Sequence, residues 1–278
     1  MEFSQVRGNR VDLGKSRTCS AARDSVNGRS SKMQRPPFLN GILERTATRF
    51  LRSIHRITHR MPVKLRAIVK QRVLVVAPHP DDEVIAVGGN LALHQRLGSE
   101  VLTLFVTQDA PAATVVRKSE AERAARLLGF DHRFLGFPQG SISLHEPAVT
   151  RAVADAIRSF RPDVIYCPFP GDHHRDHQST TACTGAAVAQ TRYDGEVWCY
   201  ELWSCLWPNI GVDISSVVDI KREAINCYTS QVAYVDYVEG ALGLNRYRGL
   251  KLGVPYVEAL FASDPRTFIG ACRTLAVV

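Results

Sequence analysis

From residue 72 onward, short apolar runs alternate with longer stretches in which apolar residues recur every three or four positions. The short runs suit buried strands, and the longer stretches suit amphipathic helices. Alternation of the two is typical of βαβ units, and therefore of an α/β fold with a parallel sheet. The pattern predicts strands at residues 73–77, 101–107, 132–135, 163–167 and 196–202.

Helices are predicted between these strands, at residues 83–97, 115–128, 147–160 and 176–191. Gly98 and Gly129 directly follow two of them, and glycine readily adopts the left-handed conformation that ends a helix. Past Trp203 the pattern is less regular, with one helix predicted at 216–228 and a Gly- and Tyr-rich stretch at 238–256. We expect this C-terminal region to return over the sheet as a lid or wall.

The N-terminal part differs from the rest of the chain. Residues 1–40 are basic and polar with few apolar positions, which predicts a disordered extension. Over residues 41–70, apolar residues recur at roughly helical spacing between arginines, which predicts a basic amphipathic helix. Such a helix suits peripheral contact with an anionic membrane, and it equally suits packing on the body or on a partner chain.

The net charge of +8 is concentrated in this N-terminal part. Up to Arg72 there are 17 Lys/Arg and 4 Asp/Glu, which leaves 18 basic and 23 acidic residues for the body. A mildly acidic body lacks the basic groove that tracks phosphates, so no nucleic-acid partner is expected. The sequence has no apolar secretory segment and no CxxC pair among its seven cysteines. We therefore expect a cytoplasmic protein with reduced thiols.

A dense polar cluster follows the first predicted strand. Residues 73–77 are apolar and run directly into residues 78–83, which read PHPDDE. In open α/β sheets, ligands bind beyond the carboxyl ends of the strands. A simple helix cap would explain one carboxylate, but neither a second adjacent one nor the histidine. This cluster is therefore a candidate for chemistry.

A second polar cluster, residues 170–177 with the sequence PGDHHRDH, follows the predicted strand at 163–167. If the two strands are neighbours in the sheet, both clusters converge on one crevice. Three ligands of the type His, Asp and His with an open fourth position make a catalytic zinc site. The same donors also accept Fe²⁺ or Mn²⁺, so the identity of the metal stays open.

Together the clusters resemble the two signature motifs of the PIG-L/LmbE-like N-deacetylases, here APHPDDE at 77–83 and HRDH at 174–177. The resemblance extends over about residues 72–262, and it makes residues 72–278 the deacetylase domain. It implies a Rossmann-like three-layer sheet without a dinucleotide. It also implies that His79, Asp82 and His177 are the metal ligands.

The same resemblance implies the catalytic roles. Asp81 is the general base that activates a metal-bound water. His174 is the general acid, or the group that steadies the tetrahedral oxyanion. Asp176 orients a nearby imidazole. Two adjacent carboxylates with different roles are geometrically natural, because Asp81 cannot point at the metal as Asp82 does.

Three further positions are candidates for substrate binding. Arg117 is similar to an arginine of the family's second helix and suits substrate hydroxyls or a phosphate, although a solvated helix arginine is an equal alternative. Gln139 stands where many relatives carry an acidic residue, which weakens the expectation of sugar recognition there. Asp172 stands where some members carry a tyrosine that assists the oxyanion, so that assistance is absent or comes from elsewhere.

The implied function is hydrolysis of the N-acetyl group of an N-acetylglucosamine-containing small molecule or glycolipid, which gives acetate and a free amine. The stretch around Trp203 and Trp207 is similar to bacterial members that act on such sugars, and these rings suit either a sugar face or the core. Three alternatives stay open. They are an amidase that acts on a thiol conjugate with the same site, a catalytically weak sugar-binding relative, and an adaptor tethered by the basic arm.

Overall fold

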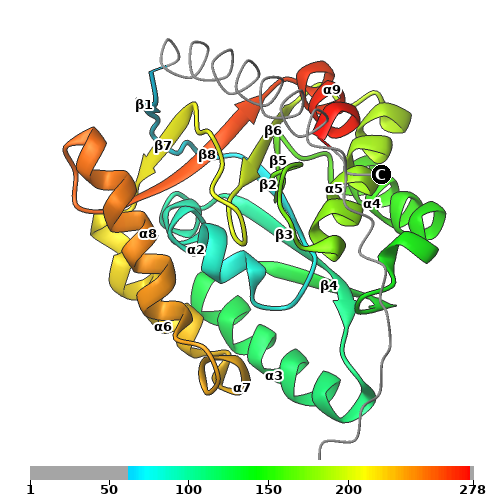
Figure 1. The fold of residues 1–278 in the computed structure, drawn as a ribbon, viewed down its shortest axis with the longest axis horizontal. Helices are drawn as coiled ribbons and strands as arrows, with labels where there is room; N and C mark the ends of the chain where they lie inside the picture. Colours follow the sequence, from blue (N-terminus) through cyan, green and yellow to red (C-terminus); the bar gives the residue numbers. More distant parts are fainter. Residues whose placement is uncertain (1–61, 276–278) are drawn as a thin grey trace, which may run out of the picture. The chain divides into compact units, whose positions relative to one another are not determined.

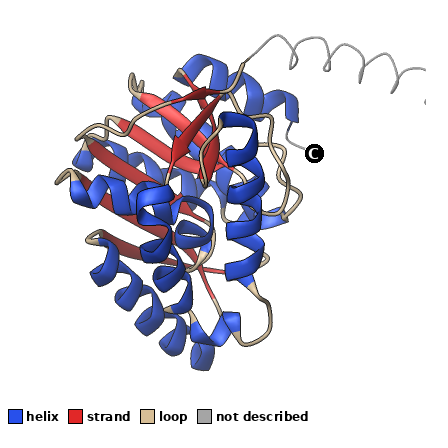
Figure 2. Cartoon of the chain, turned by 90° about the vertical axis from the view of Figure 1, so that its left-hand side faces the viewer, coloured by secondary structure: helices blue, strands red, loops and turns tan. Residues whose placement is uncertain are grey.

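In the described part of the chain, eight strands form one sheet with helices on both faces (Figure 1, Figure 2). The computed structural model describes residues 62–275. The strand order is β1-β7-β8-β6-β5-β2-β3-β4, and β8 runs antiparallel to β6 and β7 in an otherwise parallel sheet. The strands are β1 (Lys64–Leu65), β2 (Arg72–Ala77), β3 (Glu100–Gln108), β4 (Asp131–Pro138), β5 (Val164–Pro168), β6 (Glu196–Tyr200), β7 (Ile210–Asp213) and β8 (Val257–Ser263).

Alternate residues of the central strand β2 face two separate cores. Val73 and Val75 belong to one core, and Leu74 and Val76 to the other, because successive side chains of a strand point to opposite faces. The first core is covered by α2 (Asp82–Arg96), α3 (Pro111–Leu128) and α6 (Val218–Asn226), with α7 (Thr229–Val232) and α8 (Tyr237–Leu252) packed beside them. The second is covered by α4 (Glu146–Phe160), α5 (Arg175–Thr191) and α9 (Pro265–Leu275).

The predicted α/β architecture is confirmed. Each of the five predicted strands corresponds to one of β2 to β6, and each of the four predicted helices between them to one of α2 to α5. Gly98 and Gly129 have φ values of 66° and 63°, so both adopt the left-handed conformation expected after a helix. A helix also forms within the predicted range 216–228, as α6.

The C-terminal region differs from the expected lid in one respect. It adds β7 and β8 to the sheet, and β8 pairs on both sides, with Tyr200↔Leu260 toward β6 and Ile210↔Leu260 toward β7. The sheet is therefore mixed, and not purely parallel. The Gly- and Tyr-rich stretch forms helix α8, which packs on α6 and β8. The region thus extends the sheet as well as covering one face.

Most of the predicted N-terminal elements lie outside the described residues, namely the extension 1–40 and positions 41–61 of the amphipathic helix. Residues 62–70 are not helical, so the prediction of a helix that reaches residue 70 is wrong at its end. Lys64–Leu65 pairs with β7, and the Arg66 guanidinium donates to both Glu196 carboxylate oxygens at 3.0 and 2.6 Å. The sheet therefore begins before the expected domain start at residue 72. Among residues 62–275, no helix has the length and apolar content needed to cross a membrane.

Candidate active site

The two polar clusters meet at one edge of the sheet. Strands β2 and β5 are parallel neighbours, with Val75 opposite Tyr166, so the loops that follow them leave the sheet side by side. The imidazole centroids of His79 and His177 lie 5.4 Å apart, and those of His79 and His174 lie 4.9 Å apart. The expected convergence of residues 78–83 and 170–177 is therefore present in the structure.

His79, Asp82 and His177 form the centre of the cluster and are almost fully buried. The Asp82 Oδ2 atom lies 3.2 Å from His79 Nδ1 and 3.3 Å from His177 Nε2, and it accepts the backbone N–H of His79 at 2.8 Å. Burial alone would raise the pKa of Asp82, but the two rings outweigh it and hold that pKa well below its usual range. Asp82 is therefore an ionised carboxylate between two imidazoles.

Two further carboxylates support these rings. Asp176 Oδ2 lies 3.1 Å from His79 Nε2 and also accepts the backbone N–H of Gly140 at 2.7 Å. Asp172 Oδ2 lies 3.3 Å from His177 Nδ1. Asp172 is 1% exposed, and it also accepts the backbone N–H groups of His174 and Trp203. Asp172 therefore lies where it can orient the His177 ring, whereas the sequence suggested that it contacts the substrate.

The cluster has the chemistry of a cation site. Nitrogen atoms of His79, His174 and His177 lie within 4.8 Å of one another, so His174 is a further candidate ligand beside Asp82. Both ring nitrogens of His177 are buried, and within the described part of the chain their only close partners are Asp82 and Asp172 at 3.3 Å, contacts that do not have good hydrogen-bond geometry. Burial lowers the pKa of His177, but the Asp82 and Asp172 carboxylates outweigh it and raise the pKa to about 9. The neighbouring carboxylates thus hold a proton on a buried ring, and a divalent cation bound there would take the place of that proton.

Asp81 differs from its neighbour Asp82 in every contact. It occupies the position just before helix α2 with a φ of 130°, a conformation that is strained for a residue other than glycine. Its Oδ2 atom accepts from the Arg117 guanidinium at 3.1 Å. Burial and the Asp82 carboxylate raise the pKa of Asp81 to about 7, although Arg117 opposes the shift. Asp81 is thus a buried carboxylate that is suited to taking up a proton near neutral pH.

Glu83 and Tyr228 hold the strained residue in place. The Glu83 Oε2 atom accepts the backbone N–H of Asp81 at 3.0 Å, and the Tyr228 hydroxyl donates to Glu83 Oε1 at 2.5 Å. Both side chains are fully buried. Sequence reasoning included Glu83 in the motif but gave it no role, and it missed Tyr228, which lies 145 residues further along the chain.

His174 caps helix α5, and this contact determines which nitrogen carries its proton. The Nδ1 atom accepts the backbone N–H of Asp176 at 3.3 Å. Nδ1 therefore carries no hydrogen, and the neutral ring carries its proton on Nε2. Burial, and then the neighbouring His79 and His177 rings, lower the pKa of His174. His174 is consequently a neutral donor at the edge of the cluster.

The two remaining substrate candidates lie at the rim. Arg117 donates to the Pro80 carbonyl at 2.5 Å as well as to Asp81, so it is a partly buried partner of the motif and not a solvated helix arginine. Gln139 is exposed and directly precedes Gly140, whose N–H contacts Asp176. The structure thus brings all nine predicted residues to one end of the sheet, with Asp172 and Arg117 bound to other site residues.

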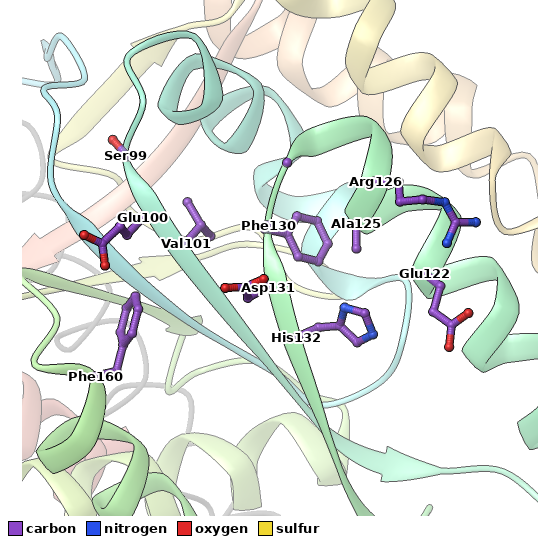
Figure 3. Close-up of a pocket in the computed structure, with 11 residues that line it drawn as sticks. Ser99, Glu100, Val101, Glu122, Ala125, Arg126, Phe130, Asp131, His132 and Phe160 are labelled. Carbon is purple, nitrogen blue, oxygen red and sulfur yellow. The ribbon is translucent and has the colours of Figure 1, made fainter.

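A hollow of about 690 Å³ lies elsewhere, at the opposite end of the sheet (Figure 3). It is lined by Glu100 at the start of β3, by Asp131 and His132 at the start of β4, and by Arg126 and Phe160 from the flanking helices. None of the predicted site residues lines it. Ligand sites of open α/β sheets lie at the carboxyl ends of strands, so we assign the chemistry to the histidine cluster in spite of the size of this hollow.

Comparisons with known proteins relate the chain to a family of deacetylases. Residues 74–188 match the family described as PIG-L, GlcNAc-PI de-N-acetylase. A probable N-acetyl-alpha-D-glucosaminyl L-malate deacetylase 2 of Bacillus anthracis is 27% identical, and the match covers 59% of this chain and 83% of the relative. A 2'-N-acetylparomamine deacetylase of Streptomyces fradiae is 30% identical, with 58% and 73% covered. The crystal structure of a conserved protein from Thermus thermophilus superposes with a TM-score of 0.61 at 32% identity, covering 68% of this chain and 93% of that one.

Proposed function

Because this chain belongs to the PIG-L family of de-N-acetylases, we propose that it hydrolyses the acetamide group of an N-acetylglucosamine-containing small molecule or glycolipid. The products are acetate and a free amine. The observation that carries the proposal is the division of roles between two adjacent carboxylates. Asp82 faces His79 and His177, whereas Asp81 faces Arg117.

The proposed metal ligands are His79, Asp82 and His177, with zinc as the preferred ion and Fe²⁺ or Mn²⁺ as alternatives. A divalent ion there would lower the pKa of a water molecule and polarise the acetamide carbonyl. Asp172 and Asp176 would orient the two ligand imidazoles through the 3.3 and 3.1 Å contacts to His177 and His79. The unsatisfied nitrogens of the buried His177 ring support this assignment.

Asp81 is the proposed general base. As water attacks the acetyl carbon, its proton passes to the Asp81 carboxylate, whose pKa near 7 suits both accepting and returning a proton. Arg117 keeps a fraction of Asp81 ionised at neutral pH, and the Glu83 contact fixes the backbone that presents it. The strained backbone conformation therefore occurs at Asp81, the residue whose carboxylate must be held in a fixed position for catalysis.

His174 is the proposed donor on the other side of the reacting carbonyl. Its Nε2–H can donate a hydrogen bond to the oxyanion, and the neutral ring keeps this proton. As the C–N bond breaks, the amine nitrogen takes the proton that Asp81 accepted from water. Its Nδ1 atom is occupied by the helix cap, so the ring does not need to change tautomer before it donates. The proton that Asp81 took from water balances the one that the leaving amine requires.

The test is an assay of acetate release from a series of N-acetylglucosaminides, repeated with Asp81→Asn. Asparagine tolerates positive φ better than most residues, so this variant should fold and keep its metal. We expect kcat to fall by about 10²- to 10⁴-fold, the usual contribution of a general base. Asp109→Asn is the matched control, because Asp109 also lies beside Arg117, at 3.5 Å from its Nε atom.

Two results would contradict the proposal. Near-normal turnover by Asp81→Asn would remove the general-base role. Absence of acetate release from every glucosaminide, together with cleavage of an N-acylated thiol conjugate, would favour the amidase alternative with the same residues.

A further inference from the structure

The loop after β6 carries two tryptophans whose rings, judged from the sequence, suit either the core or a sugar face. Trp203 is 47% exposed and Trp207 is 53% exposed, so neither belongs to the core. Strand β6 is the parallel neighbour of β5, with Pro168 opposite Tyr200, so this loop leaves the sheet beside the second polar cluster. It is therefore a third strand-end loop at the edge of the sheet that holds the candidate active site.

Hydrogen bonds join the Trp203 end of this loop to the site. The backbone N–H of Trp203 donates to Asp172 Oδ2 at 3.2 Å, and the same oxygen atom lies 3.3 Å from His177 Nδ1. The hydroxyl of the next residue, Ser204, accepts the backbone N–H of His173 at 3.1 Å. Asp172 is buried, so its contacts are shielded from water. One carboxylate oxygen thus fixes Trp203 relative to a proposed metal ligand.

The Trp203 ring lines a mostly apolar pocket of about 260 Å³ between helices α2 and α8. Tyr237, the first residue of α8, lies beside it, with ring centroids 6.2 Å apart and an angle of 75° between the planes. An edge-to-face pair of this kind leaves part of the indole uncovered, in agreement with the exposure of Trp203. Ile85 lines the pocket from α2, one turn after Asp82. The pocket and the histidine cluster are therefore neighbours, and Trp203 has contacts with both.

The lining of this pocket combines apolar surface with an unused polar group. Asn245 lines it and is 5% exposed, and its Nδ2 atom donates to the Val257 carbonyl at 3.1 Å. Its Oδ1 atom is buried and accepts no hydrogen bond within residues 62–275. A buried acceptor without a partner costs free energy, and a ligand hydroxyl would satisfy it. A pyranose ring has both matching features, C–H groups on its faces and hydroxyls at its edge.

We propose that the Trp203 indole is the platform on which the pyranose ring of the acetamido sugar stacks, and that Asp172 holds this platform at a fixed distance from His177. The inference rests on the proposed function, and it names the residue that binds the sugar ring beside the reacting acetamide. Trp203 is thus a substrate-binding residue, and Asp172 is a positioning residue. The exposed ring, the shared Asp172 oxygen and the unpartnered Asn245 acceptor in the same pocket together carry the inference.

The first experiment measures binding of the methyl glycoside of N-acetylglucosamine to the full chain by calorimetry. Trp203→Leu keeps an apolar side chain but removes the flat ring, so we expect Kd and KM to rise about tenfold, or about 1.4 kcal/mol. We expect kcat to change by less than about threefold, because stacking is the same in the bound substrate and in the transition state. Trp207→Leu is the matched control and should bind normally, since Trp207 belongs to the same loop, is equally exposed and does not line the pocket.

Trp203→Phe separates stacking from a structural role. Phenylalanine keeps an aromatic face, so most of the lost affinity should return, and zinc content and Tm should be the same in all variants. The chain has three tryptophans, and Trp198 is buried. Glycoside binding should therefore shift the fluorescence emission of the parent and of Trp207→Leu, but not that of Trp203→Phe. A lower Tm in Trp203→Leu, with no return of affinity in Trp203→Phe, would make the role structural and overturn the proposal.

Binding and hydrolysis together separate the two proposals. If the glycoside binds without being hydrolysed and Trp203→Leu weakens its binding, the platform assignment stands and the proposed function fails. If the glycoside is hydrolysed and Trp203→Leu retains the parental Kd and KM, the platform assignment is overturned and the function is retained. Equal weakening by Trp203→Leu and Trp207→Leu would also contradict the assignment. Absence of both binding and hydrolysis would contradict both proposals.

Discussion

Helix α2 carries two buried polar clusters that differ in how completely their charges are paired. At its start, Asp82 belongs to the histidine cluster, in which both His177 nitrogens make no hydrogen bond among the described residues. In its middle, the Glu258 carboxylate accepts from the Gly89 and Asn90 backbone at 2.8 and 2.7 Å and from the Lys221 ammonium at 2.6 Å. The first cluster has three carboxylates, those of Asp82, Asp172 and Asp176, around its rings, whereas the second has one cation for one carboxylate.

The second cluster has a local structural cause. Val87 is non-helical inside α2, with φ of −129° and ψ of 18°, so the backbone N–H groups after it lose their usual partners. Glu258 accepts two of them, as a capping side chain would at a helix start, and Lys221 neutralises it. The Glu258 charge is paired with Lys221 inside the protein, so this cluster holds the bent helix in place. The carboxylates of the histidine cluster are less completely paired, which suits the binding of a cation.

The largest expected effect concerns the incompletely paired cluster. His177→Ala should lower zinc content from near one per chain to background and reduce kcat/KM by more than about a thousandfold, since the metal's contribution amounts to several kcal/mol. Metal content and the shift of Tm on zinc addition are the measurements. His173→Ala is the control, because His173 belongs to the same loop but is exposed and contacts Ser204. Retention of zinc by His177→Ala would show that this cluster is not a metal site.

The paired cluster should respond in stability and not in metal binding. Lys221→Met leaves the Glu258 charge buried without its cation, which should lower the free energy of unfolding by about 3–5 kcal/mol. Chemical denaturation measures this loss, and the double variant with Glu258→Gln should recover part of it. The zinc content of the folded protein should not change. If Lys221→Met lost zinc as His177→Ala does, the two clusters would be one coupled unit.

The smallest expected effect concerns the contact that positions Asp81. Tyr228→Phe removes the hydroxyl that donates to Glu83, so kcat should fall by about tenfold with KM nearly unchanged. Stability should fall by about 1 kcal/mol. Tyr193→Phe is the control, since it removes a largely buried hydroxyl that donates to the Glu196 carbonyl at 3.0 Å, away from the site. Equal kcat losses in both variants would mean that the Tyr228 effect is not specific to Asp81.

Local sequence was sufficient to predict the strands and helices that position the site. Residues 73–77 are apolar throughout because β2 is buried on both faces, and the motif follows because ligands bind where such a strand ends. The extra strands β7 and β8 were not predicted. β7 has only four residues and β8 follows a long helix, so neither shows the repeated alternation on which the prediction relied.

The sequence by itself determined the α/β fold and the two strand-end clusters, because period and spacing encode burial and local order. The hydrolase function was implied by the resemblance of residues 77–83 and 174–177 to the motifs of a known family. Only the tertiary structure decided that Asp172 lies behind His177, that Tyr228 holds Glu83, and that α8 and α2 enclose an apolar pocket. Such contacts join positions far apart in the chain. Their partners are chosen by how the elements pack, which no local pattern specifies.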